Sequence, residues 1–165
     1  MGDEIPSHLA HFPGLYVRVG DDVREAPAAD QAVARSYPNW PNKGTILHGR
    51  RLTILAAQQR VRPNEEVRVI HVAEAMDPSA VLYAMGPKAA LGEYVDGKLV
   101  TEPAPQVRDA DPLRPPGLYD GSILAGPAVD YGYDVSTYRF QTTGPHRIVW
   151  RLGDLVSNEL LISVE

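Results

Sequence analysis

The most constraining feature of the sequence is the alternation of apolar and polar residues along its last two regular runs. Residues 146–152 place apolar side chains at every second position, and residues 158–164 largely repeat the pattern, with Leu161 as the exception. A period of two is that of a β-strand with one buried face. Gly153 and Asp154 lie between the runs and are typical turn residues. The two runs therefore predict a β-hairpin.

Five further runs have the composition of strands, because they are rich in β-branched and aromatic residues and end in turn-forming residues. They lie at residues 52–57, 66–75, 81–85, 91–101 and 131–140. Asp96-Gly97 suits a two-residue type I′ turn that sets Tyr94 opposite Leu99, and Pro63-Asn64 suits the centre of another turn. We predict an all-β fold of about seven antiparallel strands in residues 45–165.

Helical signal is concentrated in residues 27–36, which begin with a proline, contain several alanines and end before Pro38. So short a helix is unstable alone, so we expect it to dock on a sheet. Residues 15–19 alternate in polarity and could add an edge strand. We predict that residues 1–44 form an N-terminal wrap with one short helix, covering a sheet edge that would otherwise invite aggregation.

Residues 61–69 look like the turn between strands A and B of an immunoglobulin-like domain, and residues 144–150 with 157–160 look like its strands F and G. In these stretches the chain resembles the bacterial immunoglobulin-like domains, which are relatives of fibronectin type III modules. The resemblance implies an immunoglobulin-like antiparallel β-sandwich. Two departures are the absence of cysteine and the presence of His146 where a tyrosine corner would be sought. Sandwiches carry many unrelated functions, so the resemblance names no ligand.

The proline-rich residues 102–117 predict an extended loop that crosses between the sheets, or alternatively a recognition arm. The net charge of −5 argues against a nucleic-acid partner. The N-terminus has no export signal unless a leader was removed, and no apolar stretch is long enough to span a membrane. With no cysteine in the chain, we expect a cytoplasmic protein without disulfides.

The most suggestive cluster runs from Asp130 to Asp134, where Tyr131 and Tyr133 are expected on the same side of a strand with an acid at each end. Tyrosine offers a large contact area with a polar tip, which suits an interface or the mouth of a cavity. Ordinary core packing is the alternative. Trp40 is a second candidate, either as an exposed anchor for a partner or as a buried pin for the wrap.

Motifs of catalysis are missing from the sequence, which lacks the nucleophile elbow, the phosphate-binding loops and the zinc-protease motif. His71 lies inside a strand pattern and could line a site with Tyr131 and Tyr133, or serve as an interior residue. His8 and His11 lack a third ligand, and the acidic turns lack the density of a calcium loop, so we predict no metal and no cofactor.

Two functions stay open on the sequence alone. The first is a non-catalytic module that binds a protein or peptide partner, or a second copy of itself. The second is a small isomerase, cyclase or hydrolase with a cavity lined by tyrosine and histidine. A filled core favours the first, and a cavity of about 300 Å³ or more with converging polar groups favours the second.

Overall fold

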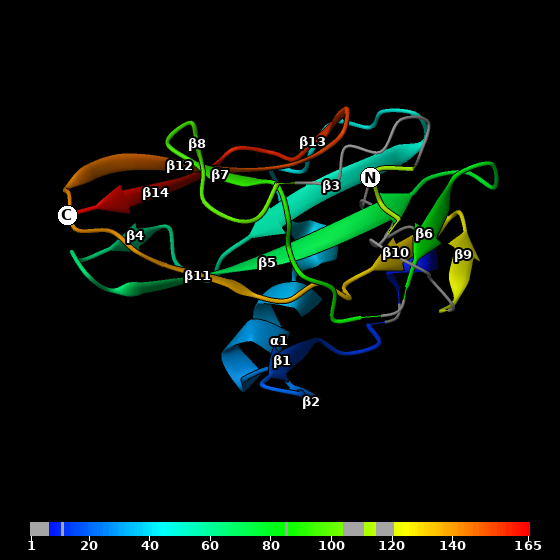
Figure 1. Cartoon of the computed structure of the whole chain (residues 1–165), viewed down its shortest axis with the longest axis horizontal. Coiled ribbons are helices and arrows are strands. Elements are labelled where there is room, and N and C mark those ends of the chain that lie inside the picture. The colour runs from blue at the N-terminus through cyan, green and yellow to red at the C-terminus, as the bar shows by residue number, and fades with distance from the viewer. Residues whose placement is uncertain (1–6, 11, 85, 104–110, 115–120) are drawn as a thin grey trace.

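The computed structural model describes residues 7–10, 12–84, 86–103, 111–114 and 121–165, and strands dominate its regular structure (Figure 1). The prediction of an all-β protein is confirmed. Within these residues lie fourteen strands, one α-helix and two 3-10 helices. The strands outnumber the seven expected because the run at residues 91–101 forms two strands and because several short strands, among them β1, β2, β9 and β10, lie outside the predicted runs.

The first sheet is built around β5 (Glu66–Ala75), the longest strand. β3 (Arg50–Leu55) pairs with its second half, as does β10 (Ala128–Asp130), while β11 (Ser136–Arg139) pairs with its first half. All three pairings are antiparallel. β3 and β10 both pair with the C-terminal half of β5, so this half of β5 has a neighbouring strand on each side.

The second sheet contains the predicted closing hairpin. Its strand order is β4 (Arg60–Val61), β14 (Leu160–Val164), β12 (Gly144–Leu152), β7 (Glu93–Val95) and β8 (Lys98–Leu99). β12 turns back at Gly153 to pair with β13 (Leu155–Val156) and then with β14. β4 and β14 run parallel, and the other pairings are antiparallel.

The predicted type I′ turn is present between β7 and β8. Asp96 and Gly97 have φ angles of 51° and 83°, and Tyr94 lies opposite Leu99. Only residues that tolerate positive φ fit both central positions, which explains the choice of Asp-Gly. The turn is held to β12 because the Asp96 carboxylate accepts the backbone N–H of Arg147 at 2.9 Å.

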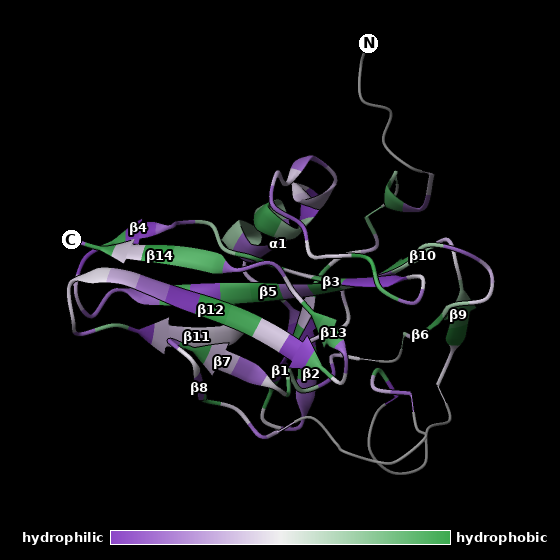
Figure 2. Ribbon diagram, turned by 90° about the horizontal axis from the view of Figure 1, so that it is seen from above, coloured by the Kyte–Doolittle hydropathy of each residue, from purple (hydrophilic) through white to green (hydrophobic). Residues whose placement is uncertain are grey.

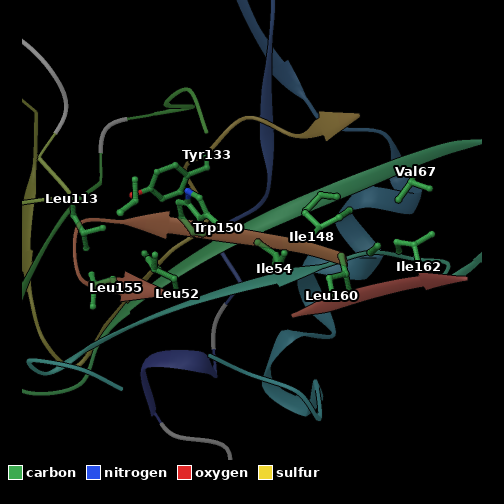
Figure 3. Packing of buried hydrophobic residues seen from close by; sticks show 14 of the residues in the cluster. Leu52, Ile54, Val67, Leu113, Tyr133, Ile148, Trp150, Leu155, Leu160 and Ile162 are labelled. Atoms are coloured by element: carbon green, nitrogen blue, oxygen red, sulfur yellow. The ribbon is translucent and has the colours of Figure 1, made fainter. Parts of the chain in front are cut away.

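The main core lies between the two sheets (Figure 3). Residues at alternate positions of β3, β5, β12 and β14 supply most of it: Leu52, Ile54, Val67, Val69, Ile148, Trp150, Leu160 and Ile162. Trp150 is fully buried, and its indole N–H donates to the carbonyl of Leu91 at 2.9 Å. The alternation that predicted the hairpin therefore marks its inward face.

The N-terminal segment covers the outer face of the first sheet rather than a sheet edge. It contains β1 (Tyr16–Val19), β2 (Asp22–Glu25) and α1 (Ala28–Arg35), and the two 3-10 helices flank these elements. β1 pairs with β2 and not with either main sheet, so the expected extra edge strand is wrong. The helix is where the sequence predicted it.

The physical reason lies in β5, whose residues are buried on both faces. Its outward side chains Ile70 and Val72 join Leu55 of β3 in a second hydrophobic cluster with Leu15 and Tyr37 of the N-terminal segment. An apolar sheet face needs a cover, and residues 7–44 provide it. Figure 1 shows the resulting layers, with β12 and β14 on one side of β3 and β5, and α1, β1 and β2 on the other.

Most of the proline-rich segment at residues 102–117 lies outside the described residues. Within its described part, Leu113 is buried in the main core. The Asp111 carboxylate accepts hydrogen bonds from Nη1 of Arg50 at 2.6 and 2.7 Å. A further pair of strands, β6 (Val81–Tyr83) and β9 (Ile123–Ala125), forms a separate two-stranded sheet.

The contacts of the β7–β8 turn with His146 are expected to make the stability of the protein depend on pH. His146 Nδ1 lies 2.6 Å from Asp96 Oδ2, and Nε2 lies 2.8 Å from the carbonyl oxygen of Thr142. Both ring nitrogens face acceptors, so the cationic imidazolium fits best, and the bonds to Thr142 and Asp96 raise the pKa of His146. The charged His146 therefore stabilises the folded state fully below its ordinary pKa of 6.5, and this stabilisation is lost as pH rises through the raised pKa.

We therefore expect the urea midpoint to fall as pH rises from about 6 to about 9. His146→Gln should flatten this part of the pH profile, since glutamine does not titrate. A wild-type midpoint that rises over the same range would contradict the assignment of the charged form.

Candidate functional site

The two tyrosines of the predicted cluster lie in different parts of the molecule. Tyr131 belongs to the outer cluster, where its ring meets those of Phe12 and Tyr37 edge-on at 5.1 and 6.2 Å. Tyr133 belongs to the main core and packs edge-on against Trp150 at 4.8 Å (Figure 3). The expectation that both project from the same side is wrong, because β10 ends at Asp130 and the chain that follows is not a regular strand.

The two acids of the cluster hold this irregular segment in place. Asp130 accepts from the Lys88 ammonium at 2.8 Å and from the backbone N–H of Gly132 at 2.7 Å. Asp134 accepts the backbone N–H of Arg18 in β1 at 3.2 Å. These bonds join three segments that are far apart in the sequence: β1, the loop after β6, and the residues after β10.

A cavity of about 300 Å³ lies where these three segments meet, and it opens to solvent. Two of the predicted residues, Asp130 and Tyr131, line it. The remaining lining is mostly apolar or glycine: Pro13, Gly14, Tyr16, Ala84, Gly86, Pro87, Leu124, Val129 and Gly132. Burial, aided by the charge of Glu74, raises the pKa of Tyr131 to about 12, so its phenol stays protonated at neutral pH.

Exposed apolar side chains surround the cavity mouth. Tyr16 of β1 is 42% exposed, and Leu124 of β9 is 36% exposed. Among the described residues, β1–β2 and β6–β9 are sheets of only two strands, so each keeps an edge without a strand partner. Figure 1 shows β6, β9 and β10 gathered at one end of the molecule. The site thus combines an apolar cavity, exposed apolar side chains in its lining, and strand edges that have no strand partner among the described residues.

His71 does not line this cavity. Its imidazole is fully buried between the sheets, where Nε2 donates to the Glu93 carboxylate at 2.6 Å and the ring packs edge-on against Trp150. The Tyr138 hydroxyl donates to the second Glu93 oxygen. Among the described residues, Nδ1 of His71 has no hydrogen-bond partner. The imidazole is therefore enclosed by core residues of the two sheets and is not exposed to solvent.

The ionisation of Glu93 reflects two opposing influences. Burial disfavours the charged carboxylate, but the attraction of His71 and the hydrogen bonds from His71 and Tyr138 outweigh it and lower the pKa of Glu93. Burial and the neighbouring carboxylate raise the pKa of Tyr138. The group is therefore a buried ionic cluster that joins β5, β7 and β11.

A second buried carboxylate, not selected in the sequence analysis, belongs to Glu74 on the outward face of β5. It accepts hydrogen bonds from the Tyr37 hydroxyl, from Nε of Arg51 at 2.9 Å and from Nε2 of His8 at 2.9 Å. Burial and the charge of Glu74 raise the pKa of Tyr37. In the sequence, the feature that could have identified Glu74 is its position as an acid within the mostly apolar end of the run at residues 66–75. The cluster fastens the N-terminal segment to the sheet.

Trp40 is half-buried and packs against both hydrophobic clusters, and its indole N–H has no hydrogen-bond partner among the described residues. The position matches the interpretation of Trp40 as a pin for the N-terminal segment better than that of an exposed anchor.

A helix long and apolar enough to cross a membrane is not found among the described residues. In the same part of the chain, no three histidine, aspartate or glutamate side chains are grouped as metal ligands. Comparison with protein-family models, curated proteins and solved structures gives no match. The interpretation of the site therefore depends on its own geometry.

Proposed function

We propose that the chain is a non-catalytic, immunoglobulin-like binding module that accepts an extended polypeptide segment at the cavity between β1, β9 and β10. Three features support the immunoglobulin-like fold. β5 pairs with both β3 and β11, β12 and β14 form the closing hairpin, and β4 pairs in parallel with β14. These strands lie in two sheets that share one core, which is the general architecture of an immunoglobulin-like sandwich.

The main support for a binding function is the position of the cavity beside β1 and β9, whose two-stranded sheets have edges without a strand partner among the described residues. Polypeptides commonly bind by adding a strand to a sheet edge, with alternate side chains entering pockets. A volume of about 300 Å³ is at the lower end for ligand sites, which suits a side chain better than a large cofactor. The exposed apolar side chains of Tyr16 and Leu124 in the lining favour a large apolar residue in the bound segment.

The enzymatic alternative receives less support from the same geometry. A general base must lie within hydrogen-bond reach of its substrate. His71 is fully buried between the sheets, and the Asp130 carboxylate in the cavity is paired with Lys88. Among the described residues, the lining of the cavity contains neither histidine nor serine.

The test is a selection of short linear peptides displayed on phage against the wild-type protein, followed by anisotropy titrations. We expect the enriched peptides to share a large apolar residue and to bind Leu124→Lys about tenfold more weakly, because a charge at the rim opposes apolar burial. Ile46→Lys is the matched control, since Ile46 is 49% exposed and lies outside the cavity lining. Peptides that bind both variants equally well would contradict the proposal.

A further inference from the structure

The outer faces of the two main sheets differ. The N-terminal segment covers the outer face of β3 and β5, whereas Leu99, Val156 and Leu161 of the second sheet are 39%, 39% and 48% exposed. Figure 2 looks onto this second sheet, with β12 and β14 in front and with alternating hydropathy along β12. This surface is independent of the cavity described above, which lies between other strands.

A hollow of about 600 Å³ lies on this face, and charged residues dominate its lining. Arg147 and Arg151 project from β12 on either side of Val149, and Tyr94 of β7 lies opposite Val149. The Arg151 guanidinium lies over the Tyr94 ring at 5.4 Å from its centroid, which orients the cation. Neither arginine side chain forms an ion pair with the described residues.

Two carboxylates also line the hollow, and they differ in their hydrogen-bond and ion-pair partners. Asp96 is held by His146 and by the backbone N–H of Arg147. The Glu159 side chain has no ion-pair partner among the described residues. The hollow and its border therefore carry three basic side chains, Arg147, Arg151 and the His146 that is bonded to Asp96, against the two carboxylates Asp96 and Glu159, on a chain whose net charge is −5. Its unmatched charge is positive, which favours an acidic partner.

The spacing of the cations defines the partner further. Arg147 and Arg151 are four positions apart on the same face of one strand, which separates their Cα atoms by about 13 Å. An extended peptide presents residues i, i+2 and i+4 on one face with the same spacing. The half-buried Val149 between the arginines offers an apolar contact, and Glu159 opposes an acid there.

We propose that the outer face of β12, β7 and β14 binds an extended acidic polypeptide segment with acids at positions i and i+4 and an apolar residue at i+2. Each acid pairs with one arginine, since the planar guanidinium matches a carboxylate with two parallel hydrogen bonds. A polynucleotide is disfavoured by the net charge of the chain and by having only two cations to meet.

The probe is the fluorescein-labelled peptide GTETLTETG, compared with GTEETLTTG, which has the same composition but places its glutamates on opposite faces. We expect saturable binding of the first peptide and about tenfold weaker binding of the second. The affinity of the first should fall as salt is added, because exposed ion pairs are screened. Failure of GTETLTETG to bind, or equal binding of both peptides, would overturn the proposal.

Charge-reversed variants localise the interaction. R147E/R151E should bind GTETLTETG about tenfold more weakly than the wild type. R24E/R62E is the matched control because it changes the net charge equally at exposed arginines outside the hollow, and it should bind as the wild type does. Equal loss in both variants would show a nonspecific charge effect and contradict the site.

Two other occupants are tested with the same proteins. Tighter binding of a labelled oligothymidine than of GTETLTETG, or a dimer by light scattering that R147E/R151E dissociates, would replace the acidic segment as the partner. Leu124→Lys does not change any residue of the hollow, so this variant should bind GTETLTETG as tightly as the wild type does. Failure at this face can therefore be told apart from failure at the cavity.

Discussion

Glu93→Leu is expected to lower the free energy of unfolding by about 3–5 kcal/mol, because it removes one partner from a fully buried ionic cluster. The substitution leaves Nε2 of His71 and the Tyr138 hydroxyl without their acceptor in the core between the sheets. Urea denaturation followed by tryptophan fluorescence would measure the loss, since Trp150 packs against His71.

The double variant His71→Leu with Glu93→Leu separates ionic pairing from packing. Replacing both partners with apolar residues of similar size removes the unpaired groups, so we expect the double variant to recover much of the stability lost in Glu93→Leu. A double variant less stable than Glu93→Leu would show that the two side chains act independently.

The same cluster predicts a response to acid. The pKa of Glu93 is lower in the folded protein than its ordinary value of 4.5. The charged carboxylate therefore contributes its full stabilisation of the folded state above pH 4.5, and this stabilisation is lost as pH falls through the pKa of the folded protein. Urea midpoints of the wild type should decline below about pH 4.5 more steeply than those of the double variant.

Glu74→Leu should produce a loss of similar size, about 3–5 kcal/mol, on the opposite face of β5. It leaves the buried Tyr37 hydroxyl and the Arg51 guanidinium without the carboxylate that both contact. Because this cluster joins the N-terminal segment to the sheet, amide exchange in α1 should accelerate more than exchange in β12.

Tyr37→Phe serves as the graded control, since it removes the hydroxyl that contacts Glu74 and Thr53 and keeps the ring. Its expected cost is about 1–2 kcal/mol. Uniform acceleration of exchange in α1 and β12 after Glu74→Leu would contradict the local role of the cluster, because it would mean that the segment and the sheets open together.

Features that depend on neighbouring residues could be predicted from the sequence. The Asp96-Gly97 turn, the hairpin at Gly153 and the helix α1 each follow from the chemistry of a few consecutive residues. The alternation along β12 also separates Arg147 and Arg151 from its apolar face, but the charged surface that they form depends on β7 and β14 beside them.

Features that join distant parts of the chain could not be predicted. Glu74 meets a histidine 66 positions away, and His71 meets a glutamate 22 positions away. Tyr131 and Tyr133 were assigned to one face on the assumption of a regular strand, and the interruption after Asp130 separates them. Of the predicted cluster, Asp130 and Tyr131 line the cavity, and the lining residues Tyr16, Pro87 and Leu124 come from other segments that the sequence did not connect to them.

The two-sided burial of β5 has a consequence for how the chain finds a single fold. An apolar strand that is covered on both sides fits its neighbours almost equally well after slipping by one residue, which exchanges its two faces. In β5 such a slip would turn Glu74 toward Trp150 and His71 toward Tyr37, away from the partners that each requires. The two buried polar residues thus act against mispairing as well as for stability, and variants that replace both with leucine should show heterogeneous strand alignment.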